Sequence, residues 1–146
     1  MRRFRGARLM PPLQTGEIDK RENTMSKLIL LVDDSVTALL RSRAFFGDQA
    51  KYRVISARDG AEGVEKALAH LPDLILMDVE MPRMSGIEAC RALRNNKATK
   101  RIPIILLTMR GEDAAVKAGL GSGCDEYMLK PVNEESLANV LKKYLR

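Results

Sequence analysis

From Leu28 onward, short apolar runs alternate with segments whose apolar residues recur at helical spacing. A continuous apolar run such as 28–32 is typical of a strand that is buried on both faces of a parallel sheet. We expect five such strands, at residues 28–32, 52–56, 74–77, 102–107 and 127–129. Because helical segments alternate with the strands, the pattern predicts an α/β fold with helices on both faces of one parallel sheet.

Five helices are expected, one after each strand. In the first, Ser35 is a candidate N-cap and Gly47 lies near the end. Its predicted buried stripe is Val36, Leu39, Leu40 and Ala44. The second follows the Asp59-Gly60 turn and has apolar residues at 64, 67, 68 and 71.

The last three helices differ in the strength of their pattern. The third has a clear face formed by Gly86, Ala89, Cys90 and Leu93. The fourth, at 112–120, is weaker and is followed by a Gly-Ser-Gly turn. The fifth begins at Asn133, with acidic residues in its first turn and basic residues at its end, which suits the helix dipole. Its predicted buried stripe is Leu137, Val140, Leu141 and Tyr144.

Carboxylates follow two of the predicted strands. Asp33 and Asp34 end the first, and Asp78 ends the third. Ligands of open α/β sheets bind beyond the carboxyl ends of the strands, where the strand order reverses. If the order is 2-1-3-4-5, these three side chains crowd together, and they repel one another unless a cation lies among them. An all-oxygen site of this kind suits Mg²⁺.

Two further strand ends supply groups that bind phosphate. Thr108 ends the fourth strand and Lys130 ends the fifth. A carboxylate nucleophile, a divalent metal and a lysine are the components that phosphoryl transfer to an aspartate needs. Each residue alone has an ordinary explanation, since an Asp after a strand is usually a cap or turn former. The combination at four strand ends favours a functional site.

Four motifs carry a resemblance to a known family. They are Leu-Val-Asp-Asp-Ser ending at Ser35, the segment 74–82 with Ser85-Gly86 after it, Leu-Leu-Thr ending at Thr108, and the segment 125–131. Over residues 27–146 the chain resembles the receiver domain of bacterial two-component response regulators. The resemblance implies a flavodoxin-like, doubly wound (βα)5 fold with strand order 2-1-3-4-5.

The resemblance also implies roles for individual residues. Asp78 is the phosphoacceptor; Asp34 binds Mg²⁺ directly, Asp33 through water and Glu80 through its backbone carbonyl. Lys130 and Thr108 contact the phosphoryl group, with a cis peptide bond before Pro131. Tyr127 is the aromatic switch residue that turns inward when Thr108 moves.

The same resemblance implies a function and partners. The chain is expected to be a stand-alone, chemotaxis-regulator-like receiver, because no effector follows Arg146. It would receive its phosphoryl group from a sensor histidine kinase or a histidine phosphotransfer protein and switch its binding to a downstream protein. It is not expected to be an enzyme in its own right, although it would assist its own phosphorylation and dephosphorylation.

Two positions depart from the family pattern. The residue after Thr108 is usually small but here is Met109, and the residue after Pro131 is often Phe but here is Val132. We expect Met109 to narrow access to the phosphate. Glu80 and Arg110 flank the same opening and are candidates to pair, with a similar effect on the phosphorylation lifetime.

Composition separates residues 1–26 from the receiver domain. The net charge is +6, and residues 1–27 hold seven Lys/Arg against three Asp/Glu. Residues 1–26 lack a helical or strand period, so we expect a disordered, basic N-terminal extension; Met25 is an alternative start. No apolar run is long enough to cross a bilayer. We therefore expect a cytoplasmic protein without a membrane partner.

The cysteines and the histidine do not suggest other sites. Cys90 and Cys124 are isolated, which argues against zinc and a disulfide framework and favours free thiols. His70, the only histidine, lies at a predicted helix end, so a catalytic triad is disfavoured.

Two other functions were weighed. A phosphatase of the haloacid dehalogenase type also forms an aspartyl phosphate, but it needs a second Asp two residues after the nucleophile, where this chain has Glu80. A nucleic-acid binder is suggested by the basic N-terminal extension. That segment has Phe4 as its sole aromatic residue and no DNA-binding module follows the last helix, so nucleic acid is an unlikely partner.

Overall fold

The computed structural model describes residues 26–47, 51–109 and 120–145. Five parallel strands form one sheet in the order β3-β2-β4-β5-β6. The strands are β2 (Lys27–Val32), β3 (Tyr52–Ala57), β4 (Leu74–Asp78), β5 (Ile104–Thr108) and β6 (Glu126–Leu129). In chain order this is 2-1-3-4-5, so the predicted fold class and strand order are confirmed.

The central strands are apolar because both of their faces are covered. All five residues of β4 and of β5 are buried. The predicted strand at 102–107 begins two residues later, at Ile104. Pro103 has no N–H to donate to the ladder, although its carbonyl accepts a bond of 2.9 Å from the amide of Ile75.

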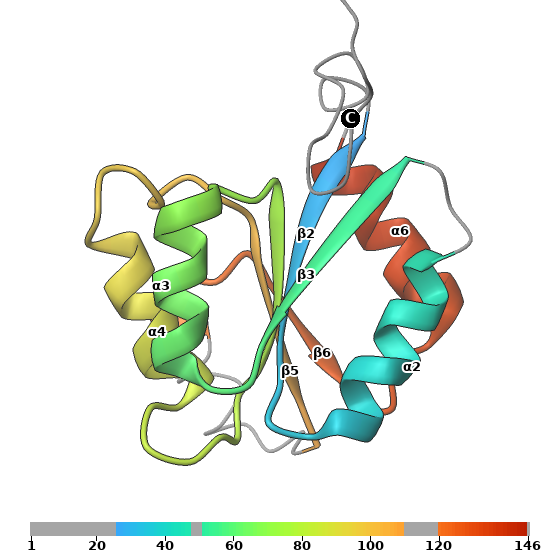
Figure 1. Cartoon of the computed structure of the whole chain (residues 1–146), viewed down its shortest axis with the longest axis horizontal. Coiled ribbons are helices and arrows are strands. Elements are labelled where there is room, and N and C mark those ends of the chain that lie inside the picture. The colour runs from blue at the N-terminus through green and yellow to red at the C-terminus, as the bar shows by residue number, and fades with distance from the viewer. Residues whose placement is uncertain (1–25, 48–50, 110–119, 146) are drawn as a thin grey trace, which may run out of the picture.

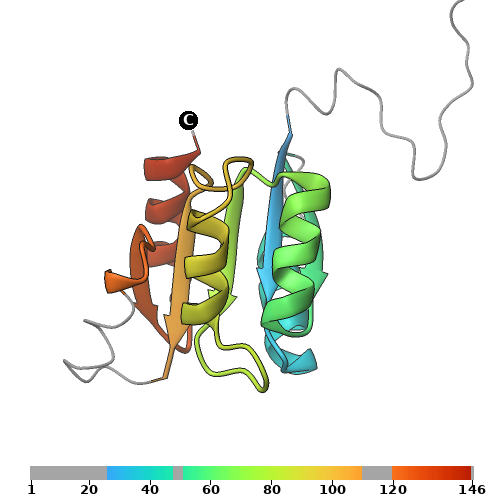
Figure 2. The same cartoon turned by 90° about the vertical axis from the view of Figure 1, so that its left-hand side faces the viewer.

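Four helices lie within the described residues: α2 (Val36–Gly47), α3 (Gly60–His70), α4 (Gly86–Arg94) and α6 (Glu134–Tyr144). Helices α3 and α4 cover one face of the sheet, and α2 and α6 cover the other (Figures 1 and 2). The sheet therefore separates two apolar clusters. The predicted fourth helix, at 112–120, lies outside the described residues except for its last residue, as do residues 1–25 of the predicted extension.

Polar side chains cap the N-termini of three helices. Asp59 and Asn133 cap α3 and α6 by accepting backbone N–H bonds, and Ser85 forms a capping box with Glu88 at the start of α4. The predicted face of α4 is buried throughout, and Leu137 and Leu141 of α6 are buried. The end of α2 at Gly47 also agrees with the prediction.

The predicted buried stripe of α2 is wrong. Of its four residues, Leu39 alone is buried; Val36 is 51% and Leu40 62% exposed, and Ala44 is exposed. The helix instead buries Phe46, whose ring packs edge-on against the rings of Phe45 and Tyr52. Apolar residues occur all around this helix, so spacing alone did not identify the face that the large aromatic rings would bury.

The second helix shows a smaller difference. It forms as predicted, but Leu68 and Leu71 are exposed and α3 buries mainly Gly60, Gly63 and Ala67. Small residues suit this face because a Cβ on Gly63 would lie 3.0 Å from the side chain of Val32. The helix can therefore lie close to the sheet.

The remaining predictions on thiols and histidine agree with the structure. Cys90 is buried and Cys124 half-buried, and neither forms a disulfide within the described residues. His70 is exposed at the end of α3. Within the described ranges, no helix combines the length and the apolar character needed to cross a membrane.

Candidate functional site

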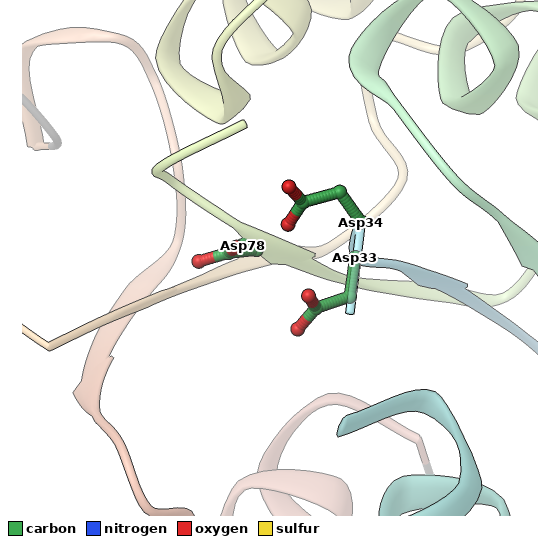
Figure 3. A group of neighbouring side chains, drawn as sticks. All are labelled: Asp33, Asp34 and Asp78. Carbon is green, nitrogen blue, oxygen red and sulfur yellow. The ribbon is translucent and has the colours of Figure 1, made fainter. Parts of the chain in front are cut away.

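Three carboxylates meet at the carboxyl ends of the neighbouring strands β2 and β4. Asp33 and Asp34 follow β2 and Asp78 is the last residue of β4 (Figure 3). Each offers an oxygen, and these atoms lie within 4.8 Å of one another. Asp33 and Asp78 are buried, whereas Asp34 is exposed. The strand order thus assembles the predicted carboxylate cluster.

Lys130 places a cation against the two buried carboxylates. Its Nζ lies 2.8 Å from Asp33 Oδ2 and 3.3 Å from Asp78 Oδ1. The amide of Lys130 donates a 2.7 Å bond to the carbonyl of Thr108, which fixes the backbone at this point, and the next peptide bond, to Pro131, is cis. Burial alone would lower the pKa of the Lys130 ammonium, but Asp33 and Asp78 outweigh burial and raise it. Lys130 therefore stays charged.

The carboxyl of Asp78 is poorly compensated. Burial and the charge of Asp33 raise its pKa to about 6, even though Lys130 acts in the opposite direction. Its buried Oδ1 atom has the 3.3 Å ion pair with Lys130 but accepts no well-formed hydrogen bond among the described residues. A buried, incompletely paired carboxylate oxygen beside two further carboxylates has the donor chemistry that a hard divalent cation requires. The residues present therefore fit Mg²⁺.

Thr108 lies across the strand end from Asp78 and is fully buried. The strand register pairs Asp78 with Leu107. The chain beyond β4 therefore passes beside Thr108. The Thr108 hydroxyl donates a 2.7 Å hydrogen bond to the exposed Glu80 carboxylate. The sequence suggested Arg110 as the partner of Glu80; Arg110 lies outside the described residues.

Tyr127 lies on β6, directly opposite Leu106 of β5. Its ring packs against the apolar cluster beneath α3 and α4. The hydroxyl is buried and has no hydrogen-bond partner within the described part of the chain. The ring thus occupies the interior, beside the strand that carries Thr108.

Sequence reasoning missed two residues that hold the site together. A Cβ on Gly86 would lie 2.2 Å from the carbonyl oxygen of Asp78, so α4 approaches the end of β4 more closely than any side chain allows. The sequence singles out Gly86 as part of a helix face but does not show this close approach to Asp78. Arg58 donates a 3.1 Å bond to the carbonyl of Asp34, which ties the loop after β3 to the carboxylates. Nothing in the sequence around Arg58 signals this contact.

A cavity of about 410 Å³ opens beside the site, between α2 and α6. Asp33 and Lys130 form its polar side, and Phe45, Leu107 and Met109 contribute apolar walls. Met109 is 74% exposed. Asp33 is the member of the carboxylate cluster that lines this cavity, together with Met109, which departs from the family pattern.

This arrangement combines a buried carboxylate, a cluster of three carboxylates that fits a divalent cation, and a fixed ammonium at the reversal point of a doubly wound sheet. These are the features of a protein class that handles phosphoryl groups on aspartate. The carboxylate two positions after Asp78, where a haloacid dehalogenase-type phosphatase needs an Asp, belongs to Glu80 and accepts a hydrogen bond from Thr108.

Comparison with known proteins identifies the family. Residues 29–142 match the model of the response regulator receiver domain. The chain is 40% identical over 124 residues to the alkaline phosphatase synthesis transcriptional regulatory protein PhoP of Bacillus subtilis, covering 84% of this chain and 50% of PhoP. It is 34% identical over 117 residues to Protein PilH of Pseudomonas aeruginosa, covering 80% of this chain and 96% of PilH. The chain thus spans half of the first relative and nearly all of the second.

A solved structure agrees with these relatives. The receiver domain of a sensor histidine kinase from Pseudomonas aeruginosa, described with a magnesium ion coordinated in its active-site cleft, is 30% identical, with a TM-score of 0.76. The match covers 82% of this chain and 97% of that one. The chain belongs to the response regulator receiver domain family, whose members are signalling domains of two-component and phosphorelay systems.

Proposed function

We propose that this chain is a receiver that accepts a phosphoryl group on Asp78 and in response changes its binding to a downstream protein. The observation that carries the proposal is the state of Asp78. Its carboxylate is buried and imperfectly paired, with a pKa raised to about 6, yet it faces Lys130 and two further carboxylates. Perturbed groups of this kind cluster at functional sites.

The proposed reaction uses the oxygen atoms of Asp78. One carboxylate oxygen attacks the phosphorus of a phosphohistidine on a sensor kinase or a histidine phosphotransfer protein. The P–N bond breaks, its electron pair stays on the imidazole nitrogen, and an acyl phosphate forms on Asp78. Lys130 stabilises the negative charge on the phosphoryl oxygens.

Magnesium would be held by Asp34 and Asp78 directly, by Asp33 through water, and by the backbone carbonyl of Glu80. When bound, it neutralises the charge that repels an incoming phosphoryl group. The chain's own groups prepare this site: Asp33 also accepts bonds from Lys130 and from the amide of Ser35, at 2.8 and 2.9 Å. Asp33 thus already accepts two hydrogen bonds, whereas the side chain of Asp34 is exposed.

The test is phosphorylation by acetyl phosphate with Mg²⁺, followed by intact-mass spectrometry. The parent chain should gain one phosphoryl group, which peptide mapping locates on Asp78. Asp78→Asn should gain none, because an amide does not form an acyl phosphate. Asp73→Asn is the matched control, since Asp73 lies outside the carboxylate cluster and bonds the amide of Leu28. Equal labelling of Asp78→Asn and the parent would contradict the assignment.

A further inference from the structure

The hydrogen bond between Thr108 and Glu80 occupies the hydroxyl that the resemblance to receiver domains assigns, together with Lys130, to the phosphoryl group. The bond is 2.7 Å long and its acceptor is a carboxylate. Bonds to ionised acceptors are shorter and stronger than neutral ones. The buried hydroxyl is therefore held by a negatively charged group of the chain itself before any phosphate arrives.

A hydroxyl carries one proton and donates one hydrogen bond at a time. Thr108 therefore cannot donate to Glu80 and to a phosphoryl oxygen on Asp78 at once. Lys130 does not share this restriction, because its three donors already reach Asp33 and Asp78 together. Of the two groups assigned to the phosphate, Thr108 is the one that must release a partner.

The backbone keeps Glu80 in position for this contact. The amide of Val79 donates a 2.8 Å bond to the carbonyl of Leu107, which continues the pairing of β4 and β5 one residue past the strand end. The amide of Gly86 in turn bonds the carbonyl of Val79 at 3.0 Å. Glu80 therefore starts from a fixed point beside Thr108.

We propose that Glu80 is a positioning residue that competes with the phosphoryl group for the hydroxyl of Thr108. In the unphosphorylated protein it holds Thr108 toward itself; on phosphorylation the hydroxyl transfers its hydrogen bond to the phosphoryl oxygen and Glu80 turns to solvent. The proposal rests on the function proposed above. It predicts that Glu80 weakens the phosphorylated state through Thr108 specifically.

The probe is beryllofluoride, a stable phosphoryl mimic, titrated with saturating Mg²⁺ into the full chain and followed by NMR. Glu80→Ala should bind it about fivefold more tightly than the parent, because Thr108 no longer loses a bond to a charged acceptor. Glu80→Gln keeps a neutral acceptor and should fall between the two. Glu65→Gln, an exposed residue of α3, is the control for the change in net charge.

A double-mutant cycle separates competition from simple charge repulsion. In a Thr108→Val background, Glu80→Ala should give no gain, because the hydroxyl for which Glu80 competes is gone. If the gain persists there, or if Glu80→Gln equals Glu80→Ala, repulsion alone explains it and the proposal is overturned. Thr108→Ser restores the hydroxyl and should restore the gain.

A measurement without any ligand completes the test. In the unliganded protein, Glu80→Ala should shift the Thr108 methyl resonance, whereas Glu65→Gln should leave it unchanged. An unchanged resonance in Glu80→Ala would show that the bond does not form in solution. If the parent is phosphorylated on Asp78 but the Glu80 variants bind beryllofluoride as tightly as the parent does, this inference alone fails. If the parent is never phosphorylated, the proposed function fails as well.

Discussion

The negative charge of Asp78 at neutral pH lowers the stability of the folded state. Its pKa is raised from 3.8 to about 6 by burial and by Asp33. Because the unfolded chain keeps the lower value, protonation of Asp78 stabilises the folded state; this contribution is complete below about pH 4 and is lost as the pH rises through 6. The charged group therefore costs about 2–3 kcal/mol at most in metal-free buffer at neutral pH.

We expect Asp78→Asn, which imitates the neutral acid, to melt several degrees above the parent at pH 7.5 in EDTA, at roughly 2–4 °C per kcal/mol. The difference should shrink toward pH 4, and adding Mg²⁺ should reduce it by stabilising the parent. Thermal melting across this range is the measurement. A variant that is less stable than the parent at pH 7.5 would contradict the assigned cause.

The carboxylates at the end of β2 are not equivalent. Asp33 is buried and bonded to Lys130 and Ser35, whereas Asp34 is exposed. We predict that Asp34→Ala weakens Mg²⁺ binding by about tenfold or more, because even groups outside the direct ligands usually contribute that much. Asp33→Ala should weaken it less. Calorimetric titration measures the Mg²⁺ affinity, with Glu65→Gln as the control for the change in charge. Equal Mg²⁺ affinities for all variants and the parent would contradict this prediction.

The residues of the candidate site could be predicted from the sequence, but some of the hydrogen bonds that they form could not. Asp33, Asp34, Asp78, Thr108 and Lys130 were identified because strand ends converge in a doubly wound sheet. The bond from Thr108 to Glu80 and the one from Arg58 to Asp34 depend on loop conformation, which no periodicity encodes. Glu80 and Arg58 lie in loops, so their partners are set only when the backbone is in place.

At the scale of elements, one arginine joins α4 to the segments that precede β5 and β6. Arg94 donates to the carbonyls of Gly123, Lys100 and Ile102 at 2.7, 3.1 and 2.7 Å. It also pairs with Asp125 at 2.7 Å. The planar guanidinium makes these bonds in fixed directions, which a lysine ammonium does not reproduce.

We expect Arg94→Lys to lower the free energy of unfolding by about 1–3 kcal/mol, since three carbonyls lose hydrogen bonds from a charged donor. Arg91→Lys, on the exposed side of the same helix, should stay within about 0.5 kcal/mol of the parent. Urea denaturation measures both. Equal effects of the two substitutions would show that the bonds contribute no net stability.

Among the elements, the strands and α4 were the most predictable. Continuous apolar runs gave β2, β4 and β5, and the face of α4 was read correctly from Gly86, Ala89, Cys90 and Leu93. The prediction of the buried face failed for α2 because apolar side chains surround this helix. The burial of Phe46 depends on its contact with the ring of Tyr52 in β3. Tertiary packing, not spacing, selects the face in such a helix.

For the whole molecule, the described core and every site residue lie beyond residue 25. The amide of Lys27 already bonds the carbonyl of Lys51, at 2.7 Å, as β2 begins. We therefore expect a chain that starts at Met25 to fold and to be phosphorylated like the full chain. The alternative is that residues 1–24 dock on the domain or on a partner.

The full chain and the chain that starts at Met25 can be compared by thermal melting and by their rates of phosphorylation by acetyl phosphate. We predict melting temperatures that agree within about 2 °C, the shift that a change under 1 kcal/mol would cause. A large loss of stability, or a several-fold change in rate, would show that the N-terminal residues belong to the working protein.

The bond between Lys130 and Asp33 joins positions 97 residues apart. A ribosome adding about 5–20 residues per second needs roughly 5–20 seconds to pass from one to the other. Once Asp78 has been added, the emerging polypeptide carries all three acidic residues of the cluster but not yet the ammonium that balances them. A nascent or proteolysed chain that ends before β6 therefore carries the proposed acceptor without the lysine that stabilises its phosphate, so signalling competence arrives only with a complete domain.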